Sequence, residues 1–149
     1  MSTNAELYDQ DFYAWTQATA ALIRAGKWYD LDREALAEEV ESLGKSDWRE
    51  LASRIAVLLR HLLKWRYQPE RRQRGRSWRS TIWEQRSRLR RLLRQSPSLV
   101  PLVPQTLAEE YPEARQRASE ETGLSLETFP ETCPWTAEQV LDTDCWPAA

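Results

Sequence analysis

Hydrophobic residues recur every three or four positions in the middle of the chain, which is the period of a helix with one buried face. The positions are Trp48, Leu51, Ile55, Leu58, Leu62 and Trp65. A cap at Ser46 or Asp47 would start this helix, and Pro69 would stop it, because the residue before a proline disfavours helix. We expect the other helices to pack against this face.

The same period predicts further helices on both sides of the central one. Their starts are marked by capping residues or by a proline, at Asp9 or Asp11, Asp32, Ser77, Ser98 and Pro112. Glycines at the favoured C-terminal stop position mark three of their ends, at Gly26, Gly44 and Gly123. In the helix that starts at Asp32, the residues expected to face inward are Leu36, Val40 and Leu43.

The C-terminal part reads differently, with prolines at positions 130 and 134 and one short helix opened by the capping box Thr136–Gln139. The chain has four glycines in 149 residues and no convincing strand pattern. We therefore expect one all-α domain over residues 1–149, a helical bundle of about five to six helices. The bundle would cover residues 8–122, and an extended Pro-containing C-terminal tail with its short helix would cover residues 124–149.

Composition excludes two broad classes of protein. Hydrophobic residues make up 41% and charged residues 30% of the chain, which is typical of a folded globular protein and not of a disordered one. No run of eighteen apolar residues exists, so no membrane span is expected. The first ten residues are polar and acidic, unlike a signal peptide. A cytoplasmic location follows as an expectation, with Cys133 and Cys145 as reduced thiols.

Charge is unevenly distributed although the net charge is only −2. Residues 64–94 carry twelve basic and two acidic residues, whereas residues 1–63 and 95–149 have net charges of −4 and −8. One interpretation is a local basic surface that binds an anionic partner. The other is that acidic helices from the flanks cover the basic segment and neutralise it.

The arginines next to a tryptophan suggest a binding site for nucleic acid. The candidate binding residues, placed in a loop and at the start of the next helix, are Arg71, Arg72, Arg74, Arg76 and Trp78. Phosphate contacts combined with base stacking suit single-stranded RNA, and DNA or an acidic protein partner would use the same charges. Arg86 lies on the apolar face of its helix instead, so we expect a buried polar network in which Glu39 pairs with it and His61 takes part.

His61, the only histidine of the chain, admits a structural and a catalytic interpretation. A partly buried imidazole commonly finds a carboxylate or carbonyl partner and plays a structural part. Alternatively, Arg54 precedes His61 by seven residues, and this Arg-x6-His spacing resembles the signature of helical, metal-independent ribonucleases of the "higher eukaryote and prokaryote nucleotide-binding" class. One histidine and two distant cysteines do not make a zinc site, so neither a metal nor another cofactor is expected.

An ordered set of short motifs resembles a known family. The set comprises residues 8–15 (YDQDFYAW), 36–44 (LAEEVESLG), 61–65 (HLLKW), 68–71 (QPER), 77–78 (SW), 97–99 (PSL), Tyr111, 114–115 (AR), 122–124 (TGL) and 129–130 (FP). Together these resemble the bacterial "domain of unknown function 29" family over nearly the whole chain. The resemblance implies a compact, soluble, all-helical bacterial domain, and it implies no reaction.

Three functions from different classes remain open at this point. The first is a non-catalytic domain that binds a macromolecule through the Arg-rich loop and helix. The second is the ribonuclease, as one half of a toxin–antitoxin pair. The third is a structural domain that self-associates as a homo-oligomer through exposed tryptophans. Whether the protein is an enzyme is left undecided by the sequence.

Overall fold

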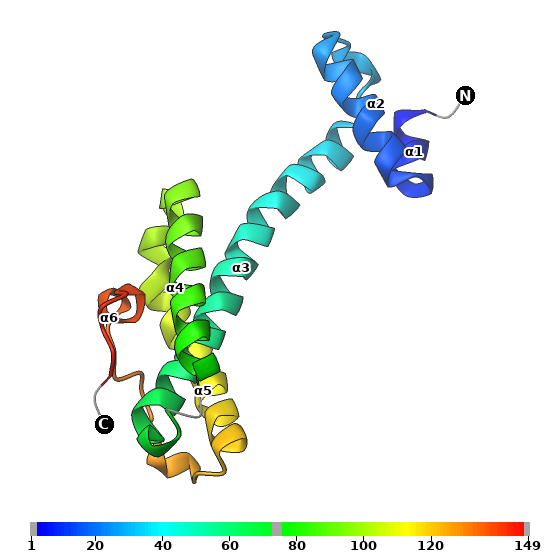
Figure 1. The fold of residues 1–149 in the computed structure, drawn as a ribbon. Helices are drawn as coiled ribbons and strands as arrows, with labels where there is room; N and C mark the ends of the chain where they lie inside the picture. Colours follow the sequence, from blue (N-terminus) through cyan, green and yellow to red (C-terminus); the bar gives the residue numbers. More distant parts are fainter. Residues whose placement is uncertain (1–2, 73–75, 148–149) are drawn as a thin grey trace. The chain divides into compact units, whose positions relative to one another are not determined.

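The structure is a computed structural model that describes residues 3–72 and 76–147. In these residues the chain is mostly helical and contains no strand, so the prediction of an all-α fold is confirmed (Figure 1). The α-helices are α1 (Asn4–Gln10), α2 (Phe12–Arg24), α3 (Arg33–Tyr67), α4 (Arg76–Gln95), α5 (Val103–Thr122) and α6 (Ala137–Leu141). Short 3-10 helices connect them: η1 (Trp28–Asp30), η2 (Pro69–Arg71), η3 (Pro97–Leu102) and η4 (Leu126–Thr128).

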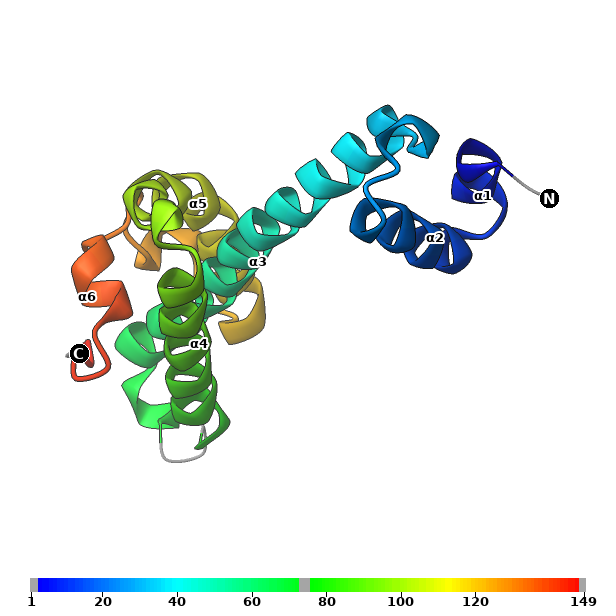
Figure 2. The same ribbon diagram turned by 90° about the horizontal axis from the view of Figure 1, so that it is seen from above.

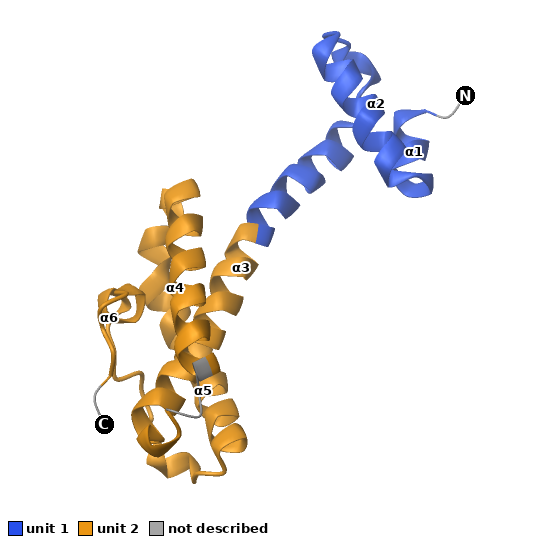
Figure 3. Cartoon of the chain, in the orientation of Figure 1, with its two compact units in different colours: residues 1–46 blue, residues 47–149 orange. Residues whose placement is uncertain are grey.

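The helices form two compact units, an N-terminal unit of residues 1–46 and a C-terminal unit of residues 47–149 (Figure 3). The boundary between them falls inside α3. The expectation that residues 1–149 behave as one domain stays a prediction.

The N-terminal unit has a small core around Trp15. As predicted, Asp11 caps α2, because its Oδ1 accepts a hydrogen bond from the Ala14 N–H at 3.0 Å. Trp15 is 2% exposed, and the ring of Tyr8 lies 4.8 Å from it. The turn after α2 uses Gly26 at φ +69°, a backbone conformation that glycine adopts without strain.

The predicted helix break at Gly44 is wrong, because α3 continues from Arg33 to Tyr67. A glycine inside a helix costs only about 1 kcal/mol relative to alanine, and good helix formers such as Leu43 and Lys45 flank it. Asp47 therefore does not cap a helix; its Oδ2 accepts a hydrogen bond from the Ser96 hydroxyl at 3.1 Å.

The apolar stripe predicted for the first part of α3 is also largely wrong. Val40 and Leu43 are 59% and 71% exposed, while Leu36 is half-buried and the neighbouring Ala35 is buried. An apolar stripe indicates a helix face that other residues can bury. In the N-terminal unit, only the beginning of this face, around Leu36, is buried.

The C-terminal unit holds the main hydrophobic core, in which the second half of α3 packs with α4 and α5 (Figures 1 and 2). The predicted central seam is buried from Leu51 to Leu62, and Trp65 is half-buried against the core. Trp48 is 47% exposed, so its predicted burial is wrong; Leu51 is the first seam position that the buried cluster includes. The other helices contribute Ile82, Leu89, Leu92, Val103, Leu107, Tyr111, Ala114 and Ala118.

A second predicted boundary, at Pro112, is wrong because α5 continues through this proline from Val103 to Thr122. Proline leaves the carbonyl four residues earlier without its helical donor, and that residue, Ala108, is exposed to solvent. The end of α5 is as predicted: Gly123 has φ +74° and its N–H donates to the Ser119 carbonyl.

The C-terminal tail returns over the core as predicted. Phe129 is buried in the core, and the Tyr111 hydroxyl donates to the Pro130 carbonyl at 2.5 Å. The capping box at Thr136 is formed and opens α6, whose Val140 is buried against α4 and α5. Among the helices that the structure describes, none combines the length and the apolar character needed to cross a membrane.

Candidate functional site

The exposed face of α4 carries a row of arginines interrupted by one tryptophan. Arg79, Trp83, Arg90 and Arg94 are all exposed, and at 3.6 residues per turn they fall within a band about 60° wide. We call these four residues the α4 stripe. The opposite face of α4 points into the core with Ile82, Leu89 and Leu92, and this amphipathic pattern fixes the direction of the stripe.

A second group of arginines lies along the edge of α4 that faces α3. Arg88 pairs with Glu84 on its own helix at 3.0 Å, in a half-exposed contact that contributes little stability. Beside it, a cavity of about 170 Å³ is lined by Glu50, Arg54, Arg88, Arg91, Leu92 and Gln95. Arg54 is already bonded there, to Glu50 at 2.8 Å and to Gln85 at 3.2 Å.

The other edge of the α4 stripe borders an open pocket. Its cavity measures about 620 Å³ and lies between α4 and the segment after α6. The lining residues are Arg79, Ser80, Trp83, Thr143, Asp144 and Trp146. We call it the tryptophan pocket.

Arg86 is 1% exposed and holds the end of α6 against α4. Its Nε donates to the Val140 carbonyl at 2.8 Å and its Nη2 to the Gln139 carbonyl at 3.3 Å. Burial lowers the pKa of this guanidinium below its ordinary value. The predicted network of Glu39, His61 and Arg86 is therefore corrected: two carbonyls at the C-terminal end of a helix, where partial negative charge gathers, take the place of a carboxylate partner.

Glu39 has a different partner, inside the N-terminal unit. Its Oε1 accepts a hydrogen bond from the Tyr8 hydroxyl at 2.6 Å. Glu38 lies next to the same hydroxyl at 3.4 Å. The acidic pair at positions 38 and 39 thus tethers α1 to the start of α3.

Of the predicted binding residues around Trp78 whose side chains the structure describes, Arg71 is exposed and Arg72 and Trp78 are half-buried. Arg72 is turned inward, where its Nε donates to the Trp65 carbonyl at 2.7 Å and its Nη2 to the Pro147 carbonyl at 3.3 Å. Trp78 is half-buried with the Lys64 ammonium 5.8 Å from its ring centroid. Arg71 is exposed, whereas Arg74 and the side chain of Arg76 lie outside the described residues.

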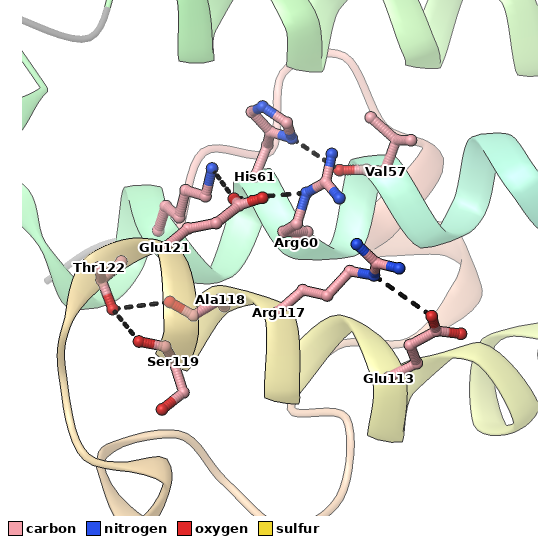
Figure 4. Close-up of polar contacts among 10 residues, drawn as sticks. Val57, Arg60, His61, Glu113, Arg117, Ala118, Ser119, Glu121 and Thr122 are labelled. Carbon is pink, nitrogen blue, oxygen red and sulfur yellow. Dashed lines mark hydrogen bonds and ion pairs between the residues drawn. The ribbon is translucent and has the colours of Figure 1, made fainter.

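His61 is half-buried and bonded to its own helix (Figure 4). Its Nδ1 lies 2.8 Å from the Val57 carbonyl, which can only accept, so Nδ1 carries the proton. Burial lowers the pKa of His61, and the nearby Lys64 and Arg60 lower it further, against the opposing effect of the Val57 bond.

Arg54 and His61 have separate contacts in the described structure. Seven residues correspond to about 10 Å along a helix axis, so one small phosphate group cannot easily bridge them. Arg54 lines the small cavity beside α4, and His61 bonds to Val57 next to Arg60 and Lys64. The contacts of both residues are those of structural side chains.

An ion-pair cluster beside His61 joins α3 to α5. Lys64, 9% exposed, pairs with Glu121, and the Arg60 Nε lies 3.5 Å from the same carboxylate (Figure 4). Partial burial alone would raise the pKa of Glu121, but the bond and charge of Lys64, together with Arg60, lower it. The cluster locks the C-terminal end of α5 onto α3.

Sequence reasoning missed the residues of the tryptophan pocket that come from the tail. Thr143, Asp144 and Trp146 follow the short α6 helix and match no motif for a site. The one available signal was a tryptophan flanked by cysteine and proline at positions 145–147, in a segment otherwise expected to lie extended. In the described part of the chain, no group of three or more His, Cys, Asp or Glu side chains is placed to hold a metal ion.

The similarity of this chain to known proteins lies at the level of its family. Neither the comparison with curated proteins nor the comparison with solved structures returned a match. A family model described as "Domain of unknown function DUF29" matches residues 7–146, from the middle of α1 through the tryptophan pocket. The resemblance found in the ordered motifs is confirmed, and this chain belongs to the DUF29 family.

Proposed function

We propose that this protein binds single-stranded RNA through the α4 stripe, without catalysing a reaction on it. The observation that carries the proposal is the stripe itself, with Arg79, Arg90 and Arg94 exposed on one helical face around Trp83, which is 62% exposed. Exposed guanidinium groups bind phosphates, and an exposed indole offers a surface on which any base can stack.

The electrostatic setting favours local rather than general binding of nucleic acid. The chain as a whole has a net charge of −2, so its attraction to polyanions depends on the basic segment. Within the predicted basic site, Arg72 is engaged with the carbonyls of Trp65 and Pro147. The binding surface is therefore shifted along the chain, from the loop before α4 to α4 itself.

The exposed indole of Trp83 favours binding of single strands over duplexes. Trp83 stands in the middle of the charged row, where an unpaired base could reach it, whereas the bases of a duplex are already stacked on one another. An acidic protein would be attracted by the same arginines, but it carries no base to stack on the indole.

The test measures binding of a labelled twelve-nucleotide RNA by fluorescence anisotropy over a range of salt concentrations. Wild-type affinity is expected to fall linearly with salt on a log–log plot. The double variant R90A/R94A should bind more weakly and flatten that slope by about 0.7 for each phosphate that the protein no longer neutralises.

The control is R117A, which removes an exposed arginine from α5 that pairs with Glu113 at 3.2 Å. It should leave the slope unchanged. Equal slopes for wild type and R90A/R94A would contradict the proposal. Binding of polyglutamate but not of RNA would replace it with an acidic protein partner.

A further inference from the structure

We infer that the tryptophan pocket holds one unstacked base of the bound strand and selects a base with amino-group donors, guanine above all. The inference rests on the proposed function, since it assigns specificity to a strand held by the α4 stripe. Arg79 and Trp83 belong both to the stripe and to the lining of the pocket, so a strand on the stripe passes its mouth.

The pocket wall contributed by the tail is held in place before any ligand arrives. The Asp144 N–H donates to Asp142 Oδ1 at 2.9 Å, and the Cys145 N–H donates to the Asp142 carbonyl at 3.1 Å. These two bonds fold residues 142–145 into a tight turn after α6. The turn presents Thr143 and Asp144 toward α4.

Trp146 is fixed by contacts on several sides. Its ring lies 4.9 Å from that of Trp65, and the guanidinium of buried Arg86 lies 5.5 Å from its centroid. Arg72 holds the next residue through the Pro147 carbonyl. Nη1 of Arg86 is buried and, among the described residues, has no hydrogen-bond partner, so one N–H donor of this wall is left unused.

The lining of the pocket favours a flat ligand. Two guanidinium groups lie by Trp146, Arg79 at 5.1 Å and Arg86 at 5.5 Å from the ring centroid. Indole and guanidinium planes both stack on nucleobases. The volume of about 620 Å³ is within the range of sites for small molecules, so one base can enter.

Asp144 gives the pocket its preference among the bases. An ionised carboxylate only accepts hydrogen bonds, so it binds groups that donate. Guanine presents a ring N–H and an amino group side by side, which matches the two carboxylate oxygens. Uracil presents two carbonyl oxygens around a single N–H, and those oxygens would face the carboxylate.

The experiment compares two twelve-nucleotide RNAs, one of uridine only and one with a single central guanosine. Wild type is expected to bind the guanosine strand at least about tenfold more tightly, the gain of roughly one hydrogen bond to a charged group. D144A should lose this preference while still binding the uridine strand. Asp144 is exposed, and its turn is held by bonds from the Asp144 and Cys145 N–H groups to Asp142, in which the Asp144 side chain takes no part, so the variant should remain folded.

Two controls separate the outcomes. E131A removes an exposed carboxylate of the same tail that does not line this pocket, and it should keep the preference for guanosine. R90A/R94A should weaken the binding of both strands and leave the ratio of their two affinities unchanged. Equal binding of both strands by wild type, still weakened by R90A/R94A, would overturn the pocket assignment and leave the proposed function standing. Absence of RNA binding at low salt would overturn both.

Discussion

At the scale of single residues, three cations in the C-terminal unit each bond a different segment of the chain. Arg86 uses the carbonyls of α6, Arg72 uses those of Trp65 and Pro147, and Lys64 uses the carboxylate of Glu121. A buried charge without a partner is strongly destabilising, so each of these contacts ties one segment of the chain to another. The arginines that remain at the surface of α4 are consequently the ones with the freedom to bind a partner.

The Glu121 contact gives the first prediction. Glu121→Ala should destabilise the protein by about 1–2 kcal/mol, less than a fully buried pair because Glu121 is 38% exposed in its side chain. The loss arises because Lys64 stays buried without its carboxylate. Urea denaturation measures the change. Glu113→Ala on the same helix removes a more exposed pair with Arg117 and should cost less than about 0.5 kcal/mol; equal losses for the two variants would argue against a special role for the Lys64 pair.

The depressed pKa of His61 gives the second prediction, on pH dependence. The folded-state pKa is lowered from the ordinary value of 6.5, so the unfolded chain binds more protons at mildly acidic pH. Stability from this group is therefore complete above pH 6.5 and decreases as the pH falls below it. Denaturation of wild type and of His61→Gln between pH 7.5 and about 5 should show a steeper decline for wild type. Parallel curves would mean that the imidazole titrates as it does in the unfolded chain.

At the scale of elements, two glycines of the chain have opposite roles. Gly123 ends α5 in a left-handed conformation at φ +74°, whereas Gly44 lies inside α3, where an added Cβ would meet nothing within 4 Å. In the amino-acid sequence, both glycines carry the same signal for the end of a helix. The structure after each glycine differs: α3 continues past Gly44, whereas after Gly123 the Leu124 carbonyl accepts a hydrogen bond from the Ser119 hydroxyl at 2.7 Å.

The third prediction substitutes both glycines by alanine. Gly44→Ala should stabilise α3 by about 0.5–1 kcal/mol, because alanine has the higher helix propensity and the site has room. Gly123→Ala should destabilise by about 1 kcal/mol, because a side chain is strained at positive φ. Hydrogen exchange of amides 44–48 reports on the first change and urea denaturation on the second. A loss of protection around position 44 in the Gly44→Ala variant would contradict the continuous helix.

At the scale of the whole molecule, the core is concentrated in one of the two units. Among the described residues, seventeen buried hydrophobic residues belong to the C-terminal unit, and only Trp15 and Ala35 belong to the N-terminal unit. Several large side chains of the N-terminal unit are exposed, including Tyr13, Trp28 and Tyr29. The residues of the α4 stripe and the tryptophan pocket all lie in the well-packed unit.

The fourth prediction concerns the two units as fragments. Residues 47–149 expressed alone should unfold in one cooperative transition, because they contain the whole main core and begin with Asp47, a good helix cap. Residues 1–46 alone should show no such transition, since so small a core offers little stability. Circular dichroism during heating measures both. A 47–149 fragment without a thermal transition would show that the larger core depends on the smaller unit.

Much of the fold was predictable because the signals that define it are local. The caps at Asp11 and Thr136 and the glycine stops at Gly26 and Gly123 involve hydrogen bonds within four residues or single backbone angles. For the candidate site, the sequence predicted the type of residue, arginine, but not which arginines are exposed. The sequence located a basic segment, but it did not reveal that Arg72 and Arg86 would turn inward while α4 presented its other arginines outward.

The helical character of the chain, several helix ends and the buried seam from Leu51 to Leu62 could all be inferred from the amino-acid sequence. Only the tertiary structure shows which apolar faces are covered, and it leaves Val40 and Trp48 exposed. It also decides which partner each buried charge has. Packing also brought residues 79–83 against residues 143–146 to make the tryptophan pocket. The physical reason is that periodicity and capping act within one or two helical turns, whereas a covering surface or a buried partner comes from residues far away in the chain.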